Sequence, residues 1–367
     1  MTWPTYTAEC VRDVAKLLRK GGSLSAYRAN RNVGVGPREG SQAYALEREI
    51  EGKFGVKHAV AVSSGTAALH AGLVALRLEG REVITSPYTF SATVSAILLA
   101  GGVPRFADID PYTFCITPAT VKPHITKRTA AIMPVHLFGY FQDIEGFKEF
   151  GLPVIEDACQ AVGAHRQGVY SGVAGLAGAY SFNGAKNIPA GEGGALVTND
   201  SKVAEKARLF VNHAENFGSR DVGMNYRMHE LVALLARHGL RDLDERNERR
   251  RALAQRLPRL IDADGGMGYI RVWMEEHVYY CTPFLWHRKE SRDAFIKRCA
   301  KRGVTIGAGY VVPPIHHYPA FKRYATRKLP VVDELSAKTL CLICDFQPDK
   351  PVSYARKVAK VVEEALR

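Results

Sequence analysis

Three short segments of the sequence combine polar side chains with turns that can present them to a ligand. The first, Ser63 to Thr66, lies between an apolar run and a helical pattern. A small turn that contains glycine lets backbone N–H groups approach an anion, and a helix that begins there adds unpaired N–H donors and a partial positive charge. The same residues could instead serve only as the cap of that helix.

The second segment is LPVIEDACQAVGA, in which Asp157 and Gln160 end an apolar run. Burying a carboxylate costs free energy unless a cation meets it. A protonated pyridine nitrogen is one such cation, and it turns an aromatic ring into an electron sink. A metal ion would be a competing partner, but no second carboxylate or His stands at ligand spacing, so we expect no metal. A helix cap is the purely structural alternative.

The third segment, AYSFNGAKNIPAGEGGALVTND, places Lys186 in a turn between two β-rich runs. Burial among small and apolar residues lowers the pKa of an amine, which exposes the neutral form that condenses with an aldehyde. Gly191, Gly193 and Gly194 would allow the chain to return close to a ligand. A solvent-exposed lysine in a hairpin is the alternative on spacing alone. In this order the three segments match a cofactor with a phosphate, a ring nitrogen and an aldehyde.

The elements around these segments predict an α/β fold. Short β-rich runs alternate with helical patterns, and this alternation is typical of βαβ units and a mostly parallel central sheet. Because ligands bind beyond the carboxyl ends of parallel strands, residues that follow the strands should meet at one edge. The predicted strands are HAVAV, EVITSP, VPRFADI, AAIMPVHLFG and LPVIEDA, with helices over residues 66–78 and 91–100. After two more short strands, AYSF and ALVTND, a helical zone follows over residues 230–257.

The last hundred or so residues predict a smaller C-terminal α+β domain. They contain YYCTPFLW, a helix over 291–302, the run VTIGAGYV and a closing helix over 353–366. We therefore expect residues 1–245 to form an N-terminal segment plus a large cofactor-binding domain. Residues 246–367 would form the small domain.

Composition limits the class of protein. With 367 residues, 46% of them hydrophobic and 24% charged, the chain is expected to be a soluble globular protein of two domains. The N-terminus predicts a short amphipathic helix instead of a signal peptide, and the longest apolar segment, Val94 to Val103, is too short for a membrane span. We expect a cytoplasmic protein that binds no membrane.

The cysteines and the charge exclude two further classes. Seven scattered cysteines are typical of a reducing compartment, and Cys341 and Cys344 are expected to be buried thiols because no second pair accompanies them. The net charge is +13, but the basic residues alternate with acidic ones and no nucleic-acid-binding motif is present. We expect no nucleic acid as a partner; a basic surface suits a small phosphorylated substrate.

Several segments that occur in order along the chain resemble the DegT/DnrJ/EryC1/StrS aminotransferase family. The resemblance covers about residues 36 to 244 and continues more weakly in YVVPPIHHYPAF. It implies the aspartate aminotransferase-like fold type I, pyridoxal 5′-phosphate as cofactor, and homodimers with active sites shared between subunits. The matching segments are SSGTAALHAGLVAL, SPYTFSATVSAILLAGGVPRFADID, PVHLFGY, IEDACQAVGA, SFNGAKNIPAGEGGALVTND and NYRMHELVA.

The resemblance also implies a role for individual residues. Lys186 would form the Schiff base with the cofactor and carry the proton in the reaction. Asp157 would pair with the pyridine nitrogen, and Gln160 would reach the phenolic oxygen of the ring. The other implied cofactor contacts are Gly65, Thr66 and Ala67 in the phosphate cradle, Ser181 as an added hydroxyl, Phe90 stacked on the ring, and Asn225 reaching the phosphate of the neighbouring subunit.

The implied reaction moves an amino group from glutamate or glutamine to a keto sugar linked to a nucleoside diphosphate, in two half-reactions. His316 and His317 are candidates for substrate contact. The chain departs from the usual family pattern at Asn183-Gly184-Ala185, at Cys159 and in LCLICDFQPDK, places that could shape the substrate pocket.

Four alternatives remain open. They are a keto-cyclitol aminotransferase, an aminohydroxybenzoate-type synthase, a non-catalytic regulator with the same fold, and a dinucleotide-dependent oxidoreductase. The last is indicated only by GVGPREG, which has neither the spacing nor the preceding strand of a dinucleotide-binding motif.

Overall fold

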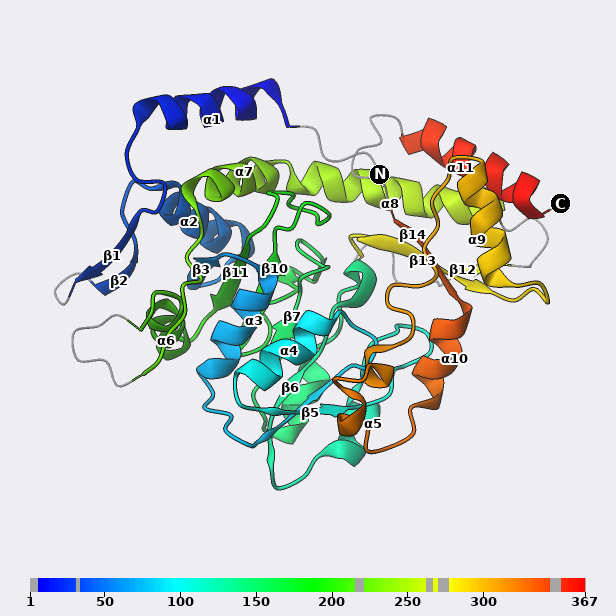
Figure 1. Ribbon diagram of the computed structural model, residues 1–367, viewed down its shortest axis with the longest axis horizontal. Coiled ribbons are helices and arrows are strands. Elements are labelled where there is room, and N and C mark those ends of the chain that lie inside the picture. Colours follow the sequence, from blue (N-terminus) through cyan, green and yellow to red (C-terminus); the bar gives the residue numbers. More distant parts are fainter. Residues whose placement is uncertain are drawn as a thin grey trace.

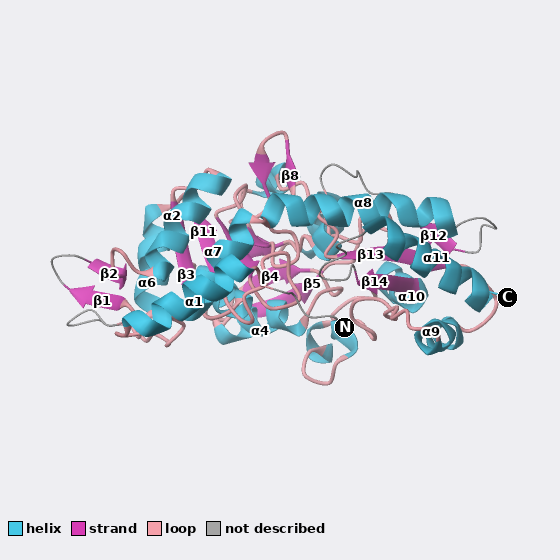
Figure 2. Cartoon of the chain, turned by 90° about the horizontal axis from the view of Figure 1, so that it is seen from above, coloured by secondary structure: helices cyan, strands magenta, loops and turns pink. Residues whose placement is uncertain are grey.

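The computed structural model describes residues 6–30, 34–214, 221–261, 267–269, 277–343 and 351–366 (Figure 1). The molecule is elongated, with the β1–β2 hairpin at one end and the β12–β14 sheet near the other (Figure 2). The described helices are α1 Ala8–Lys20, α2 Gln42–Phe54, α3 Gly65–Val74, α4 Ser91–Leu99, α5 Pro118–Val121, α6 Ser201–Val211, α7 Glu230–Arg241, α8 Leu243–Ile261, α9 Arg292–Lys301, α10 Pro330–Lys338 and α11 Pro351–Leu366. The described strands are β1 Tyr27–Asn30, β2 Gly34–Pro37, β3 His58–Val62, β4 Glu82–Thr85, β5 Val103–Phe106, β6 Thr129–Met133, β7 Ile155–Asp157, β8 His165–Arg166, β9 Val169–Tyr170, β10 Ala177–Ser181, β11 Gly194–Thr198, β12 Met267–Tyr269, β13 Cys281–Trp286 and β14 Thr339–Ile343.

Two sheets form the centre of the molecule. One has the order β5-β4-β6 with both pairs parallel, and the other has the order β3-β11-β10-β7. Parallel bridges from Ile132 to Val154 and from Val135 to Asp157 place the two sheets edge to edge. Strand β10 is parallel to β7, whereas β11 is antiparallel to both β10 and β3. The fold is therefore mixed α/β, and β11 runs the other way because a hairpin connects it to β10.

Strand β3 illustrates how the sheet is covered on both faces. Its side chains alternate in direction, as in any strand. Val60 and Val62 pack in the core that contains α3 and α6, whereas Ala59 and Ala61 pack in the core that contains α2 and α7. A strand buried on both faces needs a continuous apolar run, which explains the sequence HAVAV. Helix layers on both sides hold the sheet edge where the candidate site lies.

The C-terminal elements have a core of their own. Strands β12, β13 and β14 form an antiparallel sheet, and apolar residues of β13 and β14 pack with those of α8, α9 and α11. Helix α8 extends from the end of α7 toward α9 and α11 (Figure 1). The proposed boundary between residues 245 and 246 falls within the first turn of α8, so a continuous helix would connect the two domains.

Several predicted elements differ in extent from the described ones. The helix expected over 66–78 ends at Val74, and the helical zone over 230–257 is two helices separated at Asp242. The run VTIGAGYV of the predicted small domain contributes one bridge, from Gly307 to Cys341. The helices expected over 91–100, 291–302 and 353–366 are present with ends shifted by one to two residues, and the N-terminal amphipathic helix is α1. The β1–β2 hairpin was not predicted.

The predictions of buried thiols at Cys341 and Cys344 and of a chain without a membrane span can be compared with the described residues. Cys341 is buried in β14, while Cys344 lies outside the described residues. Among the helices that the structure describes, none combines the length and the apolar character needed to cross a bilayer.

Gly178 in β10 tests how tightly the central sheet is packed. A Cβ atom at this position would lie 2.1 Å from the backbone oxygen of Gly172, a contact that only a backbone shift can relieve. We expect Gly178→Ala to lower the free energy of unfolding by at least about 2 kcal/mol. Gly52→Ala is the matched control, because Gly52 lies in α2 with no atom near its Cβ position. This control should be stabilised by about 0.5–1 kcal/mol. Urea unfolding measures both, and equal stabilities would contradict the expectation.

Candidate functional site

A cavity of about 380 Å³ lies at the carboxyl ends of β7 and β10. Its walls come from the N-terminal ends of α3 and α4, the residues after β7, the β10–β11 connection, and Tyr280 and Tyr310 from the C-terminal part of the chain. Seven of the nine predicted cofactor-contact residues line this cavity, which brings Lys186, Asp157 and Gly65 together from three separate segments.

The N-terminus of α3 forms one end of the cavity. Gly65 and Thr66 line it, and the first N–H groups of a helix have no partner within the helix. A Cβ atom on Gly65 would lie 2.7 Å from Cys159 Sγ and 2.9 Å from Ser181 Cβ, so only glycine fits there. Ser181 also lines the cavity. Gly65, Thr66 and Ser181 can therefore hold an anionic group such as a phosphate.

Ala67 occupies a different position from the other predicted cradle residues. Its backbone N–H donates to Ser64 Oγ at 3.1 Å, and the residue is not part of the cavity wall. Ser64 is thus the N-cap of α3, as the structural alternative for this segment supposed. Because this cap uses the N–H of Ala67, it is compatible with the binding of an anion by the N–H groups of Gly65 and Thr66.

Asp157 is the last residue of β7 and is 5% exposed. Its Oδ1 accepts a hydrogen bond from the Cys159 backbone N–H at 3.2 Å, and its Oδ2 accepts one from Thr93 Oγ1 at 2.7 Å. The hydroxyl groups of Thr89 and Thr93 are 2.7 Å apart. These contacts fix the carboxylate at the cavity wall, where it can accept a proton-bearing ring nitrogen.

Gln160 is oriented by a single hydrogen bond. Its Oε1 accepts from the Phe138 backbone N–H at 2.9 Å. The amide oxygen is thereby engaged, and the NH₂ group is the part of the side chain that remains for a ligand. Because Gln160 lines the cavity, it can donate to an oxygen atom on the same ligand that meets Asp157.

Lys186 lies in the connection between β10 and β11. Its backbone N–H donates to the Asn183 carbonyl at 2.8 Å, which closes a tight turn. Burial lowers the pKa of the Lys186 amine, as expected for a nucleophilic lysine. The Nζ atom lies 4.1 Å from the centroid of the Tyr280 ring.

Glycines bring this connection back to the sheet. Gly191 and Gly193 have φ values of 84° and 141°, in the region that favours glycine. A Cβ atom on Gly194 would lie 2.6 Å from the backbone of Ser64. The three glycines expected to allow a close return of the chain therefore do so, and they place Lys186 opposite the N-terminus of α3.

The remaining predicted residues lie in three different places. Phe90, the N-cap residue of α4, lines the cavity and is 57% exposed. Asn225 is exposed and forms a bridge with Asn212, outside the wall of this cavity. His316 and His317 also lie outside that wall, and their Nε2 atoms are 3.0 and 2.7 Å from Asp333 Oδ1. Their contact with a substrate stays a prediction.

The sequence did not single out several residues of the site. Tyr280 and Tyr310 lie more than 90 residues further along the chain than Lys186. They line the same cavity only because the chain folds back. Thr93 was missed as the partner of Asp157, although the hydroxyls of Thr89 and Thr93, four residues apart at a helix start, were a visible signal. Behind the site, His136 Nε2 lies 2.8 Å from Glu156 Oε2, and both side chains are fully buried.

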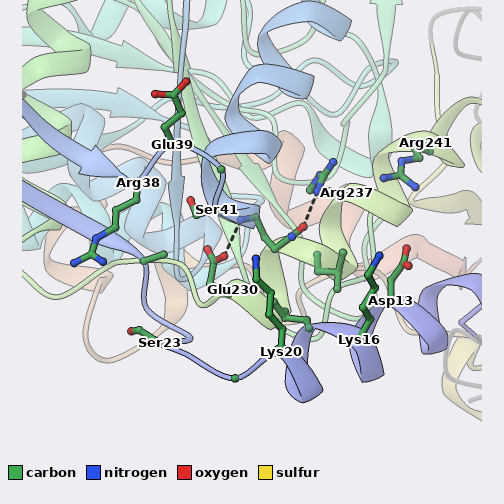
Figure 3. Close-up of a pocket in the computed structure, with 16 residues that line it drawn as sticks. Asp13, Lys16, Lys20, Ser23, Arg38, Glu39, Ser41, Glu230, Arg237 and Arg241 are labelled. Atoms are coloured by element: carbon green, nitrogen blue, oxygen red, sulfur yellow. Dashed lines mark hydrogen bonds between the residues drawn. The ribbon is translucent and has the colours of Figure 1, made fainter.

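A second cavity, of about 470 Å³, lies between α1, α2 and α7 (Figure 3). Several of its charged groups hold these helices together. Glu230 accepts from the backbone N–H groups of Gln42 and Ala43 at the start of α2, and Arg237 donates to the side chain of Gln42. His238 of α7 lies 3.0 Å from Asp13 of α1. These contacts support a structural role for this cavity.

The fold and the first cavity define a mixed α/β protein that can hold a small anionic ligand beside a reactive lysine. The family model described as the DegT/DnrJ/EryC1/StrS aminotransferase family matches residues 27–352. The chain belongs to this family of pyridoxal-phosphate-dependent transaminases.

Two curated relatives differ in function. A "pleiotropic regulatory protein" of Geobacillus stearothermophilus is 35% identical over 318 residues, which cover 83% of this chain and 84% of that protein. A UDP-N-acetyl-3-dehydro-alpha-D-glucosamine 3-aminotransferase of Acidithiobacillus ferrooxidans is 33% identical over 341 residues, which cover 89% of each chain.

Solved structures agree with the fold. An aminotransferase from Psychrobacter cryohalolentis matches with a TM-score of 0.87 and 26% identity over the whole of both chains. NtdA from Bacillus subtilis, solved with its cofactor PMP bound, matches with a TM-score of 0.81 and 27% identity over 97% of this chain and 83% of that one. DesI, solved in the presence of its TDP-sugar product, matches with a TM-score of 0.86 and 26% identity over 100% and 92%.

His277 provides a test of the wall that carries Tyr280. Its Nδ1 accepts a hydrogen bond from the Tyr279 backbone N–H at 2.8 Å, and burial lowers the pKa of its imidazole to about 3. The unfolded chain binds this proton with a pKa near 6.5, so between these two pH values the unfolded state holds more protons and stability falls as the pH falls.

We therefore expect wild-type protein to lose more stability between pH 7 and pH 4 than His277→Asn does, by about 2 to 4 kcal/mol. Asn can still accept the Tyr279 N–H but does not titrate. Urea unfolding at several pH values measures the difference. His165→Asn, at an exposed position, is the control and should follow the wild type. Parallel curves for wild type and His277→Asn would contradict the expectation.

Proposed function

We propose that the cavity binds pyridoxal 5′-phosphate bonded to Lys186, and that the chain transfers an amino group from glutamate or glutamine to a keto sugar linked to a nucleoside diphosphate. The observation that carries the proposal is that Lys186, Asp157 and the N-terminus of α3 line one cavity. These groups suit the aldehyde, the ring nitrogen and the phosphate of one cofactor. The proposal includes fold type I and the division into domains 1–245 and 246–367.

Each group of the cofactor has a partner of suitable chemistry. Gly65, Thr66 and Ser181 would hold the phosphate, and Asp157 would keep a proton on the pyridine nitrogen. Gln160 would donate its amide N–H to the phenolic oxygen. Phe90 has an exposed ring at the cavity wall and would cover one face of the cofactor. Ala67 does not line the cavity and donates its N–H to Ser64, so we propose no phosphate contact for it.

The bound cofactor would supply an electron sink that stabilises negative charge on a substrate carbon. The residues of this chain would supply orientation and proton transfer. Lys186 Nζ, in its neutral form, would take a proton from the substrate carbon that bears the amino group and would give it to the cofactor carbon to which that amino group is attached. Acid–base help by a positioned group contributes about 10² to 10⁴ in rate. The lowered pKa of Lys186 favours the neutral form that this role needs.

The acceptor is inferred from the relatives and from charge. The Acidithiobacillus relative acts on a UDP-linked keto sugar, and DesI has a TDP-sugar product. A net charge of +13 favours an acceptor that carries a diphosphate. Glutamate and glutamine are donors that the family resemblance implies.

The proposal also requires a second copy of the chain. Among the described residues that line the cavity, Lys186 is the only cation, and Glu192 adds a negative charge at the wall. Neither the cofactor phosphate nor a substrate diphosphate has a cationic partner there. A homodimer in which Asn225 and basic residues of the partner subunit complete the site would remove this deficit. Asn225 is exposed and is not part of the wall of its own cavity, as this role needs.

The visible absorption spectrum of the purified protein tests cofactor, lysine and donor together. We expect an absorption band of the lysine-linked cofactor that disappears when excess glutamate is added. Lys186→Ala should lack this band completely, because no other amine lines the described cavity. Lys202→Ala, at an exposed position in α6, is the control and should keep the band. A protein without a band after addition of the cofactor would overturn the proposal.

A non-catalytic regulator is the second candidate, because the Geobacillus relative is a regulatory protein. Such a protein would keep the band but would not respond to glutamate, glutamine or other amino acids. Transfer of nitrogen from a donor to UDP- or TDP-linked keto sugars, followed by mass spectrometry, separates the two. An amino sugar product that contains ¹⁵N from labelled glutamate supports the aminotransferase function.

A further inference from the structure

The ring of Tyr280 lies directly beside the amine of Lys186. The distance from Nζ to the ring centroid is 4.1 Å, within the range of about 6 Å over which a cation is attracted to an aromatic face. We propose that this face binds the ammonium group that Lys186 forms when the lysine is not bonded to the cofactor and holds a proton. Tyr280 is then a positioning residue of the site, and the inference rests on the proposed function.

The backbone around Tyr280 holds the ring in place. Arg250 Nη1 donates to the carbonyl oxygens of Tyr279 and Tyr280, at 3.2 Å each. The N–H of Val278 donates to the Gly139 carbonyl at 2.9 Å. Gly139 has a φ of 100°, and a Cβ there would lie 2.9 Å from the Tyr280 backbone nitrogen, so the two segments pack without a gap.

A second ring supports the first from the side. The rings of Tyr280 and Tyr310 are 6.0 Å apart at an angle of 82°, an edge-to-face arrangement. Tyr310 is itself held by its backbone N–H, which donates to the Tyr88 hydroxyl at 3.4 Å. The ring beside Lys186 therefore cannot move away without disturbing two other segments.

Several other groups lie near Lys186, some of them neutral, and the Tyr280 ring acts on the amine separately from them. Those that act on its charge are Asp157, Cys159, Cys281 and Arg250, and the cavity wall adds Glu192, Tyr280 and Tyr310. Burial raises the pKa of the Cys159 and Cys281 thiols well above their usual value, so both are neutral. Burial also raises the pKa of Tyr280 to about 12 and that of Tyr310, so both phenols are neutral.

Two formal charges remain close to Lys186 besides Glu192 at the wall. The negative charge of Asp157 favours its ammonium form, and the positive charge of Arg250 opposes it. Asp157 is already engaged by the Thr93 hydroxyl and the Cys159 N–H. The neutral ring face of Tyr280 therefore contributes a separate attraction that needs no ionised partner.

This attraction has a consequence for the chemistry of the lysine. Burial disfavours the ammonium form, and a ring face offsets part of that cost. Tyr280 would thus keep the released Lys186 inside the cavity with a proton at Nζ, and would set the pH at which that proton is lost.

The experiment compares Tyr280→Leu with Tyr280→Phe in the full-length protein after removal of the cofactor. Pyridoxal 5′-phosphate is added back at a series of pH values, and its capture rate is followed by absorbance. Capture needs the neutral amine, so differences between variants in the pH midpoint of the rate report differences in the pKa of Lys186. Leu removes the aromatic face and keeps an apolar side chain; Phe keeps the face and removes the hydroxyl.

We expect the midpoint of Tyr280→Leu to lie about 0.5 to 1 pH unit below that of the wild type. Below the midpoint, its capture should be about three- to tenfold faster, because more of the amine is neutral. Tyr280→Phe should keep the wild-type midpoint. An unchanged or raised midpoint in Tyr280→Leu, or an equal shift in both variants, would overturn the inference.

Two controls keep the result interpretable. Thermal unfolding shows whether each variant is folded, and Tyr280→Met, which also lacks a ring, replaces Leu if that variant is not. Wild-type protein that captures no cofactor at any pH would overturn the proposed function. Normal capture with no effect of losing the ring would overturn only the role of Tyr280.

Discussion

The close approach between the start of α3, the end of β10 and the start of β11 is the constraint on which the site depends. A Cβ atom on Gly65 would collide with Cys159 and Ser181, and one on Gly194 would collide with the backbone of Ser64. With any larger side chain at either position, the helix end and the strands would separate. The unpaired N–H groups of α3 would then no longer face the same space as Lys186, which the β10–β11 connection carries. Two glycines without side-chain chemistry thereby set the distance between the reactive groups.

The same sheet edge also holds two buried ionisable groups, Lys186 and Asp157, and provides partners for both. An amine and a carboxylate placed in a small cavity cost free energy unless each has partners. Asp157 has two hydrogen-bond donors, Thr93 and the Cys159 N–H, and Lys186 has the ring of Tyr280. The site can therefore exist before a cofactor arrives. Such preorganisation favours binding, because little free energy is then spent on ordering the site when the ligand binds.

The parts of the site that the sequence predicted are those with a local signal. Lys186 lies between two β-rich runs and is followed by glycines, Asp157 ends an apolar strand, and Gly65 begins a helix. Each of these patterns lies within about ten residues. Tyr280 and Tyr310 have no such signal, because their roles arise only when distant segments meet. The assignment of Ala67 depended on which N–H group Ser64 takes, and the sequence does not determine that choice. The alternation of strands and helices is a local pattern, and it predicted the α/β class. The edge-to-edge contact of the two sheets joins distant segments, and it is visible only in the structure.

The cavity walls come from two kinds of element, and this difference matters for how one fold can bind different acceptors. Apart from Lys186, which lies in the β10–β11 connection, most groups assigned to the cofactor come from the ends of strands and the start of a helix, which are held by the sheet and two core layers. The groups that complete the cavity, among them Asn183, Glu192 and Tyr310, come from connections. Connections tolerate substitution more readily than buried strands do. Two proteins similar to this chain handle a UDP-linked sugar and a TDP-linked sugar. If the strand ends hold the cofactor in the same way and the connections differ between such proteins, the determinants of the acceptor proposed here would lie in the connections and not in the sheet.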